Sequence, residues 1–357
     1  FFLEFLYSFY FKYVNYIILS IILIMKILIT GSSGFIGFHL SKLLLENNHK
    51  VHGFDSMNSY YDVKLKNSRL KILRKYKKFT FSKGQLENRK KLDSIFKKFK
   101  PNVVIHLAAQ AGVRYSIDKP RVYLDSNVTG TFNIIEASHR VKVKHLMMAS
   151  SSSVYGANES IPFKETDKTE TQLSIYAATK KANESMAHSY SNIWKIPITM
   201  LRFFTVYGPW GRPDMALFKF TKGILNNKKI DIYNYGKMYR DFTYIDDIVN
   251  GIKLLINKAP NINQRKKFKN DSLSPVAPFR ILNIGNTKKV YLLNFIKQIE
   301  LELGKKAKRN YMPLQKGDVK ETLSNTNLLK KITGYNPKTN YKSGVKKFIT
   351  WYKEYYL

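Results

Sequence analysis

KILITGSSGFIG, residues 26–37, is the stretch from which the fold of this chain can be predicted. A short apolar run leads into Gly31, Gly34 and Gly37, and a helical pattern of apolar residues follows them. Glycines between a strand and a helix allow a tight turn and a close approach of the backbone to a ligand. The N-terminus of the helix adds free N–H groups and the positive end of its dipole. The stretch therefore predicts a turn suited to a pyrophosphate group, although its spacing is G-x-x-G-x-x-G and not the usual G-x-G-x-x-G.

The same order of apolar run and amphipathic stretch recurs as far as residue 205. The later runs are Lys50–Phe54, Asn102–Ala109, His145–Ser150 and Ile198–Phe204. Strands that alternate with helices predict a parallel sheet with helices on both faces. We expect an α/β fold, with a Rossmann-type, doubly wound parallel sheet over residues 25–205 and a smaller C-terminal α/β domain over 206–357. The boundary lies where Pro209, Gly211 and Pro213 interrupt the pattern, and some later elements are expected to return to the first domain.

The composition narrows the classes of protein to consider. The chain has 357 residues and no cysteine, which excludes disulfides, thiolate zinc sites and cysteine nucleophiles and favours a reducing compartment such as the cytoplasm. Its formal charge of +36 invites comparison with nucleic-acid-binding proteins. The lysines are spread over many segments, so we predict a basic surface that steers anionic ligands and no dedicated nucleic-acid site. No cluster of His, Asp and Glu has the spacing of a metal site, and His106 and His145, which lie in apolar runs, are expected to be core residues.

Residues 1–24 are almost wholly apolar and aromatic, and they are long enough to span a bilayer. Met25 directly precedes the first predicted strand, which should lie deep in the fold, so a membrane helix would leave no linker. We interpret 1–24 as an upstream translated or fused stretch. The alternative is a signal-type anchor, which would attach the protein to a membrane.

Asp55 adds a second feature of a nucleotide site. It ends the second predicted strand, 24 residues after Gly31. An acid at this place can accept hydrogen bonds from the ribose of an adenosine. No arginine follows at once to bind a 2′-phosphate, so the pattern predicts NAD and not NADP as the cofactor.

Tyr176 and Lys180 belong to a second motif, Tyr-Ala-Ala-Thr-Lys, which follows a serine-rich strand end at 150–153. Residues four apart share a helix face, so Lys180 is expected near the Tyr176 hydroxyl. A nearby ammonium favours the phenolate and would lower the pKa of Tyr176 toward that of a usable general base. A serine hydroxyl of this strand end can hold the substrate oxygen that gives up its proton.

With these motifs the chain resembles the extended short-chain dehydrogenase/reductase family and, within its NAD-dependent epimerases and dehydratases, the UDP-glucuronate 4-epimerases. The similarity runs from Met25 nearly to the C-terminus. It rests on the stretches HLAAQAGVRYS (106–116), SSSSVYGAN (150–158), YAATKKANE (176–184), LRFFTVYGPWGRPDMALF (201–218) and RDFTYIDDI (240–248).

The resemblance implies C4 epimerisation of a UDP-sugar, with UDP-glucuronate and UDP-galacturonate as the expected pair. Tyr176 would remove the proton of the sugar 4-hydroxyl, Ser151 would orient that hydroxyl, and Lys180 would bind the nicotinamide ribose. Hydride would pass from C4 to tightly held NAD and return to the other face of a transient 4-keto sugar.

The resemblance also assigns residues to the two ligands. The cofactor residues are Gly31, Gly34, Phe35, Ile36, Gly37, Asp55, Gln85, Leu86, Ala108, Gln110, Tyr176 and Lys180. The substrate residues are Ser152, Ser153, Thr205, Arg212, Arg240 and Asp318. Among these, the hydroxyls suit a C5 carboxylate, the arginines suit the UDP phosphates, and Asp318 suits the uridine ribose.

Two positions bear on specificity and on cofactor retention. Related dehydratases and decarboxylases carry an acid just before Val-Tyr-Gly, where this chain has Ser152 and Ser153, which implies simple epimerisation. Relatives usually place an aspartate against the adenine amino group, where this chain has Gln85. The Gln85 carbonyl could still accept a hydrogen bond from the adenine amino group, but it carries no charge, which implies weaker retention of NAD.

The resemblance further implies a homodimer through a four-helix interface around 122–140 and 176–194. One alternative activity is 4-epimerisation of a UDP-N-acetylhexosamine or of UDP-glucose, because the sequence does not reveal the volume of the pocket. A remote alternative is a basic nucleic-acid-binding or regulatory protein that keeps the dinucleotide fold.

Overall fold

The computed structural model of the protein describes residues 24–264, 268 and 270–357. Nearly all of the apolar segment 1–24 lies outside these residues, so its interpretation as an upstream stretch or as an anchor stays a prediction. Among the helices in the described part of the chain, none combines the length and the apolarity needed to cross a membrane.

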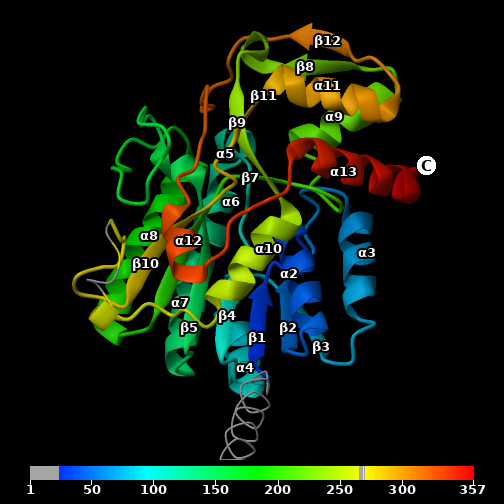
Figure 1. Ribbon diagram of the computed structural model, residues 1–357. Coiled ribbons are helices and arrows are strands. Elements are labelled where there is room, and N and C mark those ends of the chain that lie inside the picture. The colour runs from blue at the N-terminus through cyan, green and yellow to red at the C-terminus, as the bar shows by residue number, and fades with distance from the viewer. Residues whose placement is uncertain (1–23, 265–267, 269) are drawn as a thin grey trace, which may run out of the picture.

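A sheet of seven parallel strands forms the centre of the molecule, in the order β10-β6-β5-β4-β1-β2-β3 (Figure 1). The strands are β1 (Lys26–Thr30), β2 (Lys50–Asp55), β3 (Phe79–Lys83), β4 (Val103–His106), β5 (His145–Ser151), β6 (Ile198–Phe203) and β10 (Phe279–Ile284). The strand order reverses between β1 and β4, which opens a crevice at the carboxyl ends of these two strands. The predicted Rossmann-type, doubly wound sheet is confirmed, and β10, from late in the chain, extends it beside β6.

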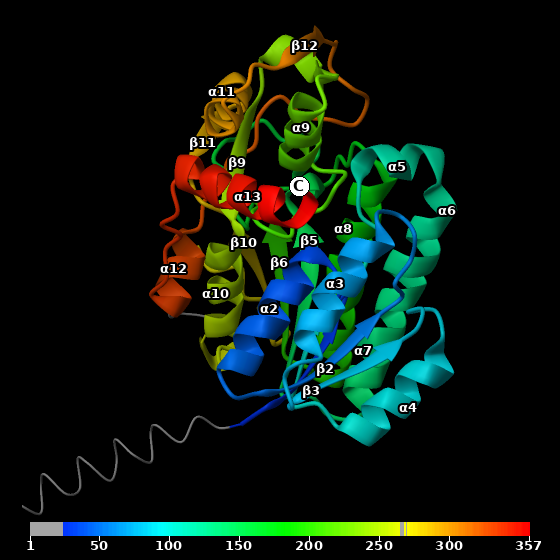
Figure 2. The ribbon, with the colours of Figure 1, turned by 90° about the vertical axis from the view of Figure 1, so that its right-hand side faces the viewer.

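Helices cover both faces of the sheet (Figure 2). One face carries α2 (Phe35–Glu46), α3 (Val63–Leu73) and α10 (Ile245–Leu255), and the other carries α4 (Arg89–Phe99), α7 (Gly130–Arg140) and α8 (Ile175–Trp194). The side chains of β1 alternate between them: Ile27 and Ile29 join the core that includes α2 and α10, and Leu28 joins the core that includes α4 and α7. Successive residues of a strand face opposite sides, so a strand that is apolar throughout is buried on both faces.

Two small sheets and three helices lie above the carboxyl edge of the central sheet (Figure 1). The small sheets have the strand orders β11-β9-β7 and β12-β8. These elements are β7 (Thr205–Tyr207), β8 (Lys229–Ile232), β9 (Tyr239–Tyr244), β11 (Lys289–Tyr291), β12 (Lys308–Tyr311), α9 (Ala216–Leu225), α11 (Leu292–Leu303) and α13 (Tyr341–Tyr356). Shorter helical segments are α5 (Val113–Asp118), α6 (Pro120–Tyr123), the π-helix Leu124–Thr129, α12 (Asn327–Thr333) and the 3-10 turns Ser152–Tyr155, Tyr233–Gly236 and Ile262–Gln264. Because α10 and β10 pack with the first domain, the boundary between 205 and 206 stays a prediction.

Two strands end earlier than the apolar runs that predicted them. The run 102–109 forms a strand only as far as His106, and the chain then turns along the crevice, where Ala108 N donates to Thr30 Oγ1 at 3.1 Å. The run 198–204 forms a strand only as far as Phe203, because Thr205 already begins β7, which pairs with β9 in a different sheet. An apolar run indicates burial and not strand structure as such. Residues 107–109 after β4 are half-buried and Phe204 after β6 is buried, so each apolar run continues beyond the end of its strand.

Candidate active site at the carboxyl edge of the sheet

A cavity of about 950 Å³ opens between the carboxyl edge of the central sheet and the elements above it. This volume is at the upper end of the range for small-molecule sites. Every site residue expected from the sequence lines the cavity. They are Gly31, Gly34, Phe35, Ile36, Gly37, Asp55, Gln85, Leu86, Ala108, Gln110, Ser151, Ser152, Ser153, Tyr176, Lys180, Thr205, Arg212, Arg240 and Asp318. The fold brings all of them to one place, and the role of each stays a prediction.

The glycine turn between β1 and α2 packs closely against the loop after β4. A Cβ added to Gly31, whose φ is +73°, would lie 2.8 Å from Ala108 N, and a Cβ on Gly37 would lie 2.0 Å from Gly31 O. Gly34 has no side chain to cap the first N–H groups of α2. A side-chain-free backbone at a helix N-terminus can cradle a pyrophosphate, so these residues fit a dinucleotide cofactor.

Asp55 and Gln85 lie at the ends of neighbouring strands. The Asp55 carboxylate accepts hydrogen bonds from Ser33 N at 3.0 Å and from Met57 N at 2.8 Å. These bonds fix the carboxylate at the cavity, where the sequence predicts an adenosine ribose. Gln85 follows β3 and is exposed, whereas Leu86 beside it is buried. The position of Gln85 leaves its side-chain amide free to turn toward a ligand.

The loop after β4 forms another part of the cavity wall. Gln110 N donates to Asn127 Oδ1 at 2.8 Å, and Asn127 Nδ2 donates back to Gln110 O at 3.0 Å. Asn127 also donates to the Thr179 hydroxyl of α8 at 3.2 Å. This buried asparagine therefore fixes the loop with Gln110 relative to the helix that carries the catalytic motif.

Tyr176 and Lys180 come from the first turns of α8, opposite Ser151 at the end of β5. The helix begins where Ser174 Oγ accepts a hydrogen bond from Ala177 N at 3.1 Å, which is the usual role of an N-cap serine. The side chain of Ser151 lies near enough to the Tyr176 hydroxyl to act on its pKa. Serine and tyrosine are thus paired, as a proton-transfer site requires.

Burial and two neighbouring side chains shift the pKa of Tyr176. Burial raises the pKa of Tyr176, while the Ser151 side chain and the charge of Arg212 act against this rise. The Lys180 ammonium donates to Ala149 O at 2.8 Å, and burial lowers the pKa of Lys180 to about 8. Arg212 is thus a cation that favours the phenolate of Tyr176, and the Lys180 ammonium donates to a strand carbonyl. The expectation that Lys180 lowers the pKa of Tyr176 stays a prediction.

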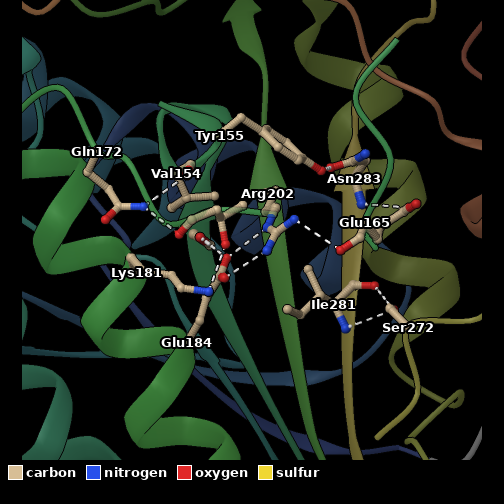
Figure 3. Close-up of polar contacts among 12 residues, drawn as sticks. Val154, Tyr155, Glu165, Gln172, Lys181, Glu184, Arg202, Ser272, Ile281 and Asn283 are labelled. Atoms are coloured by element: carbon tan, nitrogen blue, oxygen red, sulfur yellow. Dashed lines mark hydrogen bonds and ion pairs between the residues drawn. The ribbon is translucent and has the colours of Figure 1, made fainter. Parts of the chain in front are cut away.

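An ion pair close to Lys180 on α8 was not predicted. Arg202 on β6 donates to both carboxylate oxygens of Glu184, at 2.9 Å each (Figure 3). The Ser150 hydroxyl donates to the same carboxylate at 2.6 Å, and the two charged side chains are 2% and 3% exposed. Glu184 also raises the pKa of Lys180, against the larger effect of burial. The signal in the sequence was an acid four residues after Lys180, on the same helix face.

Glu165 lies on the other side of Arg202 (Figure 3). Its carbonyl accepts from Arg202 Nη1 at 3.2 Å, and its carboxylate accepts from Asn283 N at 3.0 Å. The Tyr155 hydroxyl donates to Asn283 Oδ1 at 2.7 Å. Burial raises the pKa of Glu165 to about 7. This network attaches the segment that follows the Val-Tyr-Gly motif to β6 and β10.

Three half-buried hydroxyls line the cavity beside Ser151. Ser152 and Ser153 lie in the turn directly after β5, and Thr205 begins β7. Ser153 Oγ accepts a hydrogen bond from Ser151 Oγ at 3.2 Å. In the described part of the chain, the hydroxyls of Ser152 and Thr205 make no hydrogen bond to the protein. They can therefore donate to an anionic group in the cavity.

Arg212 faces the cavity from the loop after β7. Its Nε and Nη2 donate to the two carboxylate oxygens of Asp214 at 3.0 and 2.5 Å, and the Tyr60 hydroxyl donates to the same carboxylate at 3.1 Å. Sequence reasoning missed Asp214 and Tyr60. Asp214 stands inside the stretch 201–218 that carries the resemblance, whereas no pattern pointed to Tyr60.

A second arginine site lies around Asp318. Arg240 Nη2 donates to Asp318 Oδ1 at 2.8 Å. Arg114 Nη2 is 3.9 Å from Asp318 Oδ2, and its guanidinium lies 4.4 Å from the centre of the Tyr233 ring. Arg114 stands inside the stretch 106–116 but was not predicted as a site residue. Two cations around one carboxylate leave a net positive charge, which suits a phosphate.

Both histidines expected in the core are buried there. His106 is hydrogen-bonded to the hydroxyls of Thr30 and Thr131, and burial lowers its pKa to about 3. His145 is hydrogen-bonded to the Thr199 hydroxyl, and burial lowers its pKa to about 4. Over the described residues, no group of three or more histidine, aspartate and glutamate side chains is placed to hold a metal ion.

The chain is similar to known proteins over nearly its whole length. It is 54% identical to the protein CapI of Staphylococcus aureus over 333 residues, which are 93% of this chain and 99% of that one. It is 48% identical to the probable UDP-glucuronate 4-epimerase of Rhizobium meliloti (strain 1021) over 334 residues, 93% of this chain and 98% of the relative.

Among solved structures, the UDP-glucuronic acid 4-epimerase of Bacillus cereus in complex with UDP-glucuronic acid and NAD is similar in fold. Its TM-score is 0.83, with 32% sequence identity over 93% of this chain and 100% of that one. The model of the NAD dependent epimerase/dehydratase family matches residues 27–269, from the first strand into the elements above the sheet. The chain therefore belongs to the NAD dependent epimerase/dehydratase family.

Proposed function

We propose that this protein is an NAD-dependent UDP-glucuronate 4-epimerase, which interconverts UDP-glucuronate and UDP-galacturonate. The observation on which the proposal rests is the meeting of three groups in one cavity. These are the glycine turn, the pair of Ser151 and Tyr176, and the hydroxyls of Ser152 and Thr205 that make no hydrogen bond to the described residues. The relatives named for this activity support the same substrate.

The turn at Gly31, Gly34 and Gly37 would hold the pyrophosphate of NAD, and Asp55 would accept hydrogen bonds from the adenosine ribose. Gln85 and Leu86 would lie at the adenine, and Ala108 and Gln110 would line the path toward the nicotinamide. When bound, NAD supplies an acceptor and donor of hydride at C4 of the sugar. We expect its retention to be weaker than with an aspartate at position 85, because the Gln85 carbonyl carries no charge.

Tyr176 acts as the general base and then as the general acid. Its phenolate takes the proton of the sugar 4-hydroxyl while the C4 hydride leaves, which yields the 4-keto sugar. After the keto sugar turns over, the hydride returns to its other face and Tyr176 gives the proton back to the C4 oxygen, so atoms and electrons balance over the cycle. Ser151, which lies beside Tyr176, would hold the C4 oxygen, and the ammonium of Lys180 would hold the nicotinamide ribose.

The choice of a uronic acid follows from the groups next to Ser151. The hydroxyls of Ser152, Ser153 and Thr205 can donate to a C5 carboxylate, and Arg212 adds a positive charge on the same wall of the cavity. No acid stands just before Val154 to drive elimination or decarboxylation, because both preceding residues are serines. The resemblance implied Arg212 and Arg240 for the diphosphate. Because the charge of Arg212 acts on Tyr176, we assign Arg212 to the sugar and propose that Arg240 and Arg114, which meet at Asp318, would bind the diphosphate. Asp318 would bind the uridine ribose.

Proton NMR of UDP-glucuronate incubated with protein that begins at Met25, without added NAD, tests the proposal. Appearance of UDP-galacturonate establishes the substrate, the reaction and the retained cofactor together. If activity appears only after NAD is added, the protein loses NAD during purification. If UDP-glucose or a UDP-N-acetylhexosamine is converted instead, the proposed substrate is wrong. If no UDP-sugar reacts and the protein binds DNA in a salt-dependent way, it is a nucleic-acid-binding or regulatory protein with a dinucleotide fold.

We also propose a homodimer that works in the cytoplasm. Along the two segments predicted for the interface, Val122, Leu124 and Ile193 are exposed apolar side chains, and exposed apolar patches mark contact surfaces. Light scattering at micromolar concentration measures the mass of the particle. A mass near 42 kDa, that of one chain of 41.6 kDa, would contradict the dimer.

A further inference from the structure

The loop before Arg212 is held by its carbonyl groups. Three successive carbonyls, those of residues 209–211, each form a hydrogen bond with a side chain of α2 or α3, two helices of the predicted NAD-binding domain. His39 Nε2 bonds to Pro209 O at 2.9 Å, and Arg69 Nη2 donates to Trp210 O at 2.6 Å and to Gly211 O at 3.3 Å. His39 belongs to α2 and Arg69 to α3, which lie side by side in Figure 2.

The other end of the Arg69 guanidinium reaches the glycine turn. Its Nη1 donates to Ser33 O at 2.9 Å and to the Tyr61 hydroxyl at 2.8 Å. One guanidinium therefore joins the turn that would hold the NAD pyrophosphate to the loop that precedes Arg212. The planar fork of an arginine can bridge separate acceptors in this way, whereas the point charge of a lysine cannot do so equally well.

Packing alone gives no reason for an arginine at this place. The Arg69 side chain is fully buried, and all of its hydrogen-bond partners among the described residues are uncharged. A buried cation without a carboxylate costs folding free energy. Arg69 does not line the cavity, so its effect on a ligand must pass through other residues.

The loop is also strained, and its surroundings hold the strain in place. Trp210 has φ of +59°, in the left-handed region that a bulky residue avoids. Its ring lies 5.5 Å from Phe38, 5.3 Å from Trp351 and 4.9 Å from Tyr355, measured between ring centres. Such a conformation persists only where neighbouring groups determine it, and it is common at functional sites.

A second contact between the same two parts of the chain supports the link. Tyr60, on the segment after β2, donates to Asp214, which in turn holds the Arg212 guanidinium on its two oxygens. Arg212 is thus fixed from both sides: its backbone follows the carbonyls bound by Arg69, and its side chain is oriented by Asp214.

We propose that Arg69 is a positioning residue, which holds the loop 208–211 against the glycine turn so that Arg212 faces the reacting sugar. The inference rests on the proposed function for its substrate, because it assigns to Arg212 an anionic group of the UDP-sugar. Arg69 would thus connect the glycine turn to the loop before Arg212 without lining the cavity itself.

Steady-state kinetics of the holoenzyme test this with Arg69→Gln, Arg212→Gln and the double variant. We expect Arg69→Gln to raise KM for UDP-glucuronate by about tenfold or more, the size of a lost hydrogen bond to a charged group. The rise of activity with pH should also move to higher pH, because Arg212 would no longer favour the phenolate of Tyr176. In the Arg212→Gln background, the change at Arg69 should add little further effect.

Arg69→Lys keeps the charge, so its KM should fall between those of the wild type and Arg69→Gln. Arg280→Lys is the matched control: Arg280 is equally buried, pairs with Asp271 and does not line the cavity, so it should lower stability without changing KM. Unchanged KM and pH profile in Arg69→Gln, or full additivity with Arg212→Gln, would overturn the proposal. If the wild type does not convert UDP-glucuronate, calorimetry with UDP-glucuronate replaces KM. An affinity for UDP-glucuronate that Arg69→Gln leaves intact would then overturn the proposal independently of the reaction.

Discussion

Replacing Glu184 by glutamine perturbs the charges close to Lys180 on α8 with almost no change in volume. The Glu184 carboxylate accepts two bonds from Arg202 and one from the Ser150 hydroxyl. A glutamine keeps one oxygen, which can still bind Ser150, but its NH2 group faces the N–H groups of Arg202. The arginine then stays buried and charged without a counter-ion.

The expected loss of stability follows from burial, since the two side chains are 2% and 3% exposed. Removal of one partner of a buried ion pair costs about 3–5 kcal/mol. At about 2.1 cal/mol/K per residue, the unfolding entropy of a 357-residue chain is about 0.75 kcal/mol/K. The melting temperature of Glu184→Gln should therefore fall by about 4–7 °C in calorimetry.

The same variant should change the pH dependence of the reaction. Burial lowers the pKa of Lys180 to about 8, and Glu184 opposes that effect. Without the carboxylate, the pKa of Lys180 falls further, so the ammonium is lost at lower pH. The alkaline limb of the profile of kcat against pH should move to lower pH, as followed by NMR from pH 6 to 10.

Asp271→Asn serves as the control, because Asp271 and Arg280 form an equally buried pair, 3% exposed on each side, away from the cavity. It should lower the melting temperature by a similar amount and leave the alkaline limb in place. The reasoning is refuted if Glu184→Gln melts like the wild type, or if its alkaline limb does not move while the protein remains folded.

Three further outcomes are expected. Tyr176→Phe should lower kcat by about 100-fold or more while the NAD content of the purified protein, measured after denaturation, stays that of the wild type; an active Tyr176→Phe would remove the tyrosine from the mechanism. Gly37→Ala should be purified without NAD, because the new Cβ would lie 2.0 Å from Gly31 O and push the turn open; a full complement of NAD would contradict this. Burial raises the pKa of Glu165 from its ordinary 4.5 to about 7, so at this group the folded protein binds more protons than the unfolded chain between these values. The contribution of Glu165 to stability should therefore fall as pH rises from about 4.5 to about 7, against the opposite effect of the buried histidines, whose pKa burial lowers. In urea denaturation Glu165→Gln should lack that fall, and an equal pH dependence in both proteins would exclude Glu165 as its source.

The sequence was sufficient for features that depend on neighbouring residues. Apolar runs alternate with amphipathic stretches, and this local periodicity predicts a doubly wound sheet because each strand and helix must bury its apolar side. The carboxyl ends of parallel strands meet at one edge. Residues at or just after the ends of those strands, such as Gly31, Asp55, Gln85 and Ser151, can therefore be assigned to one site from their positions in the sequence.

Only the tertiary structure decided how charges pair across distant segments. Arg69 meets Trp210 although 141 positions separate them, and Tyr60 meets Asp214 across 154 positions. Lys180 donates to Ala149 O, 31 positions earlier in the chain, because β5 packs against α8. Hydrogen bonds and ion pairs act over a few ångströms in space, and no local pattern in the chain records which side chains the fold will bring within that distance.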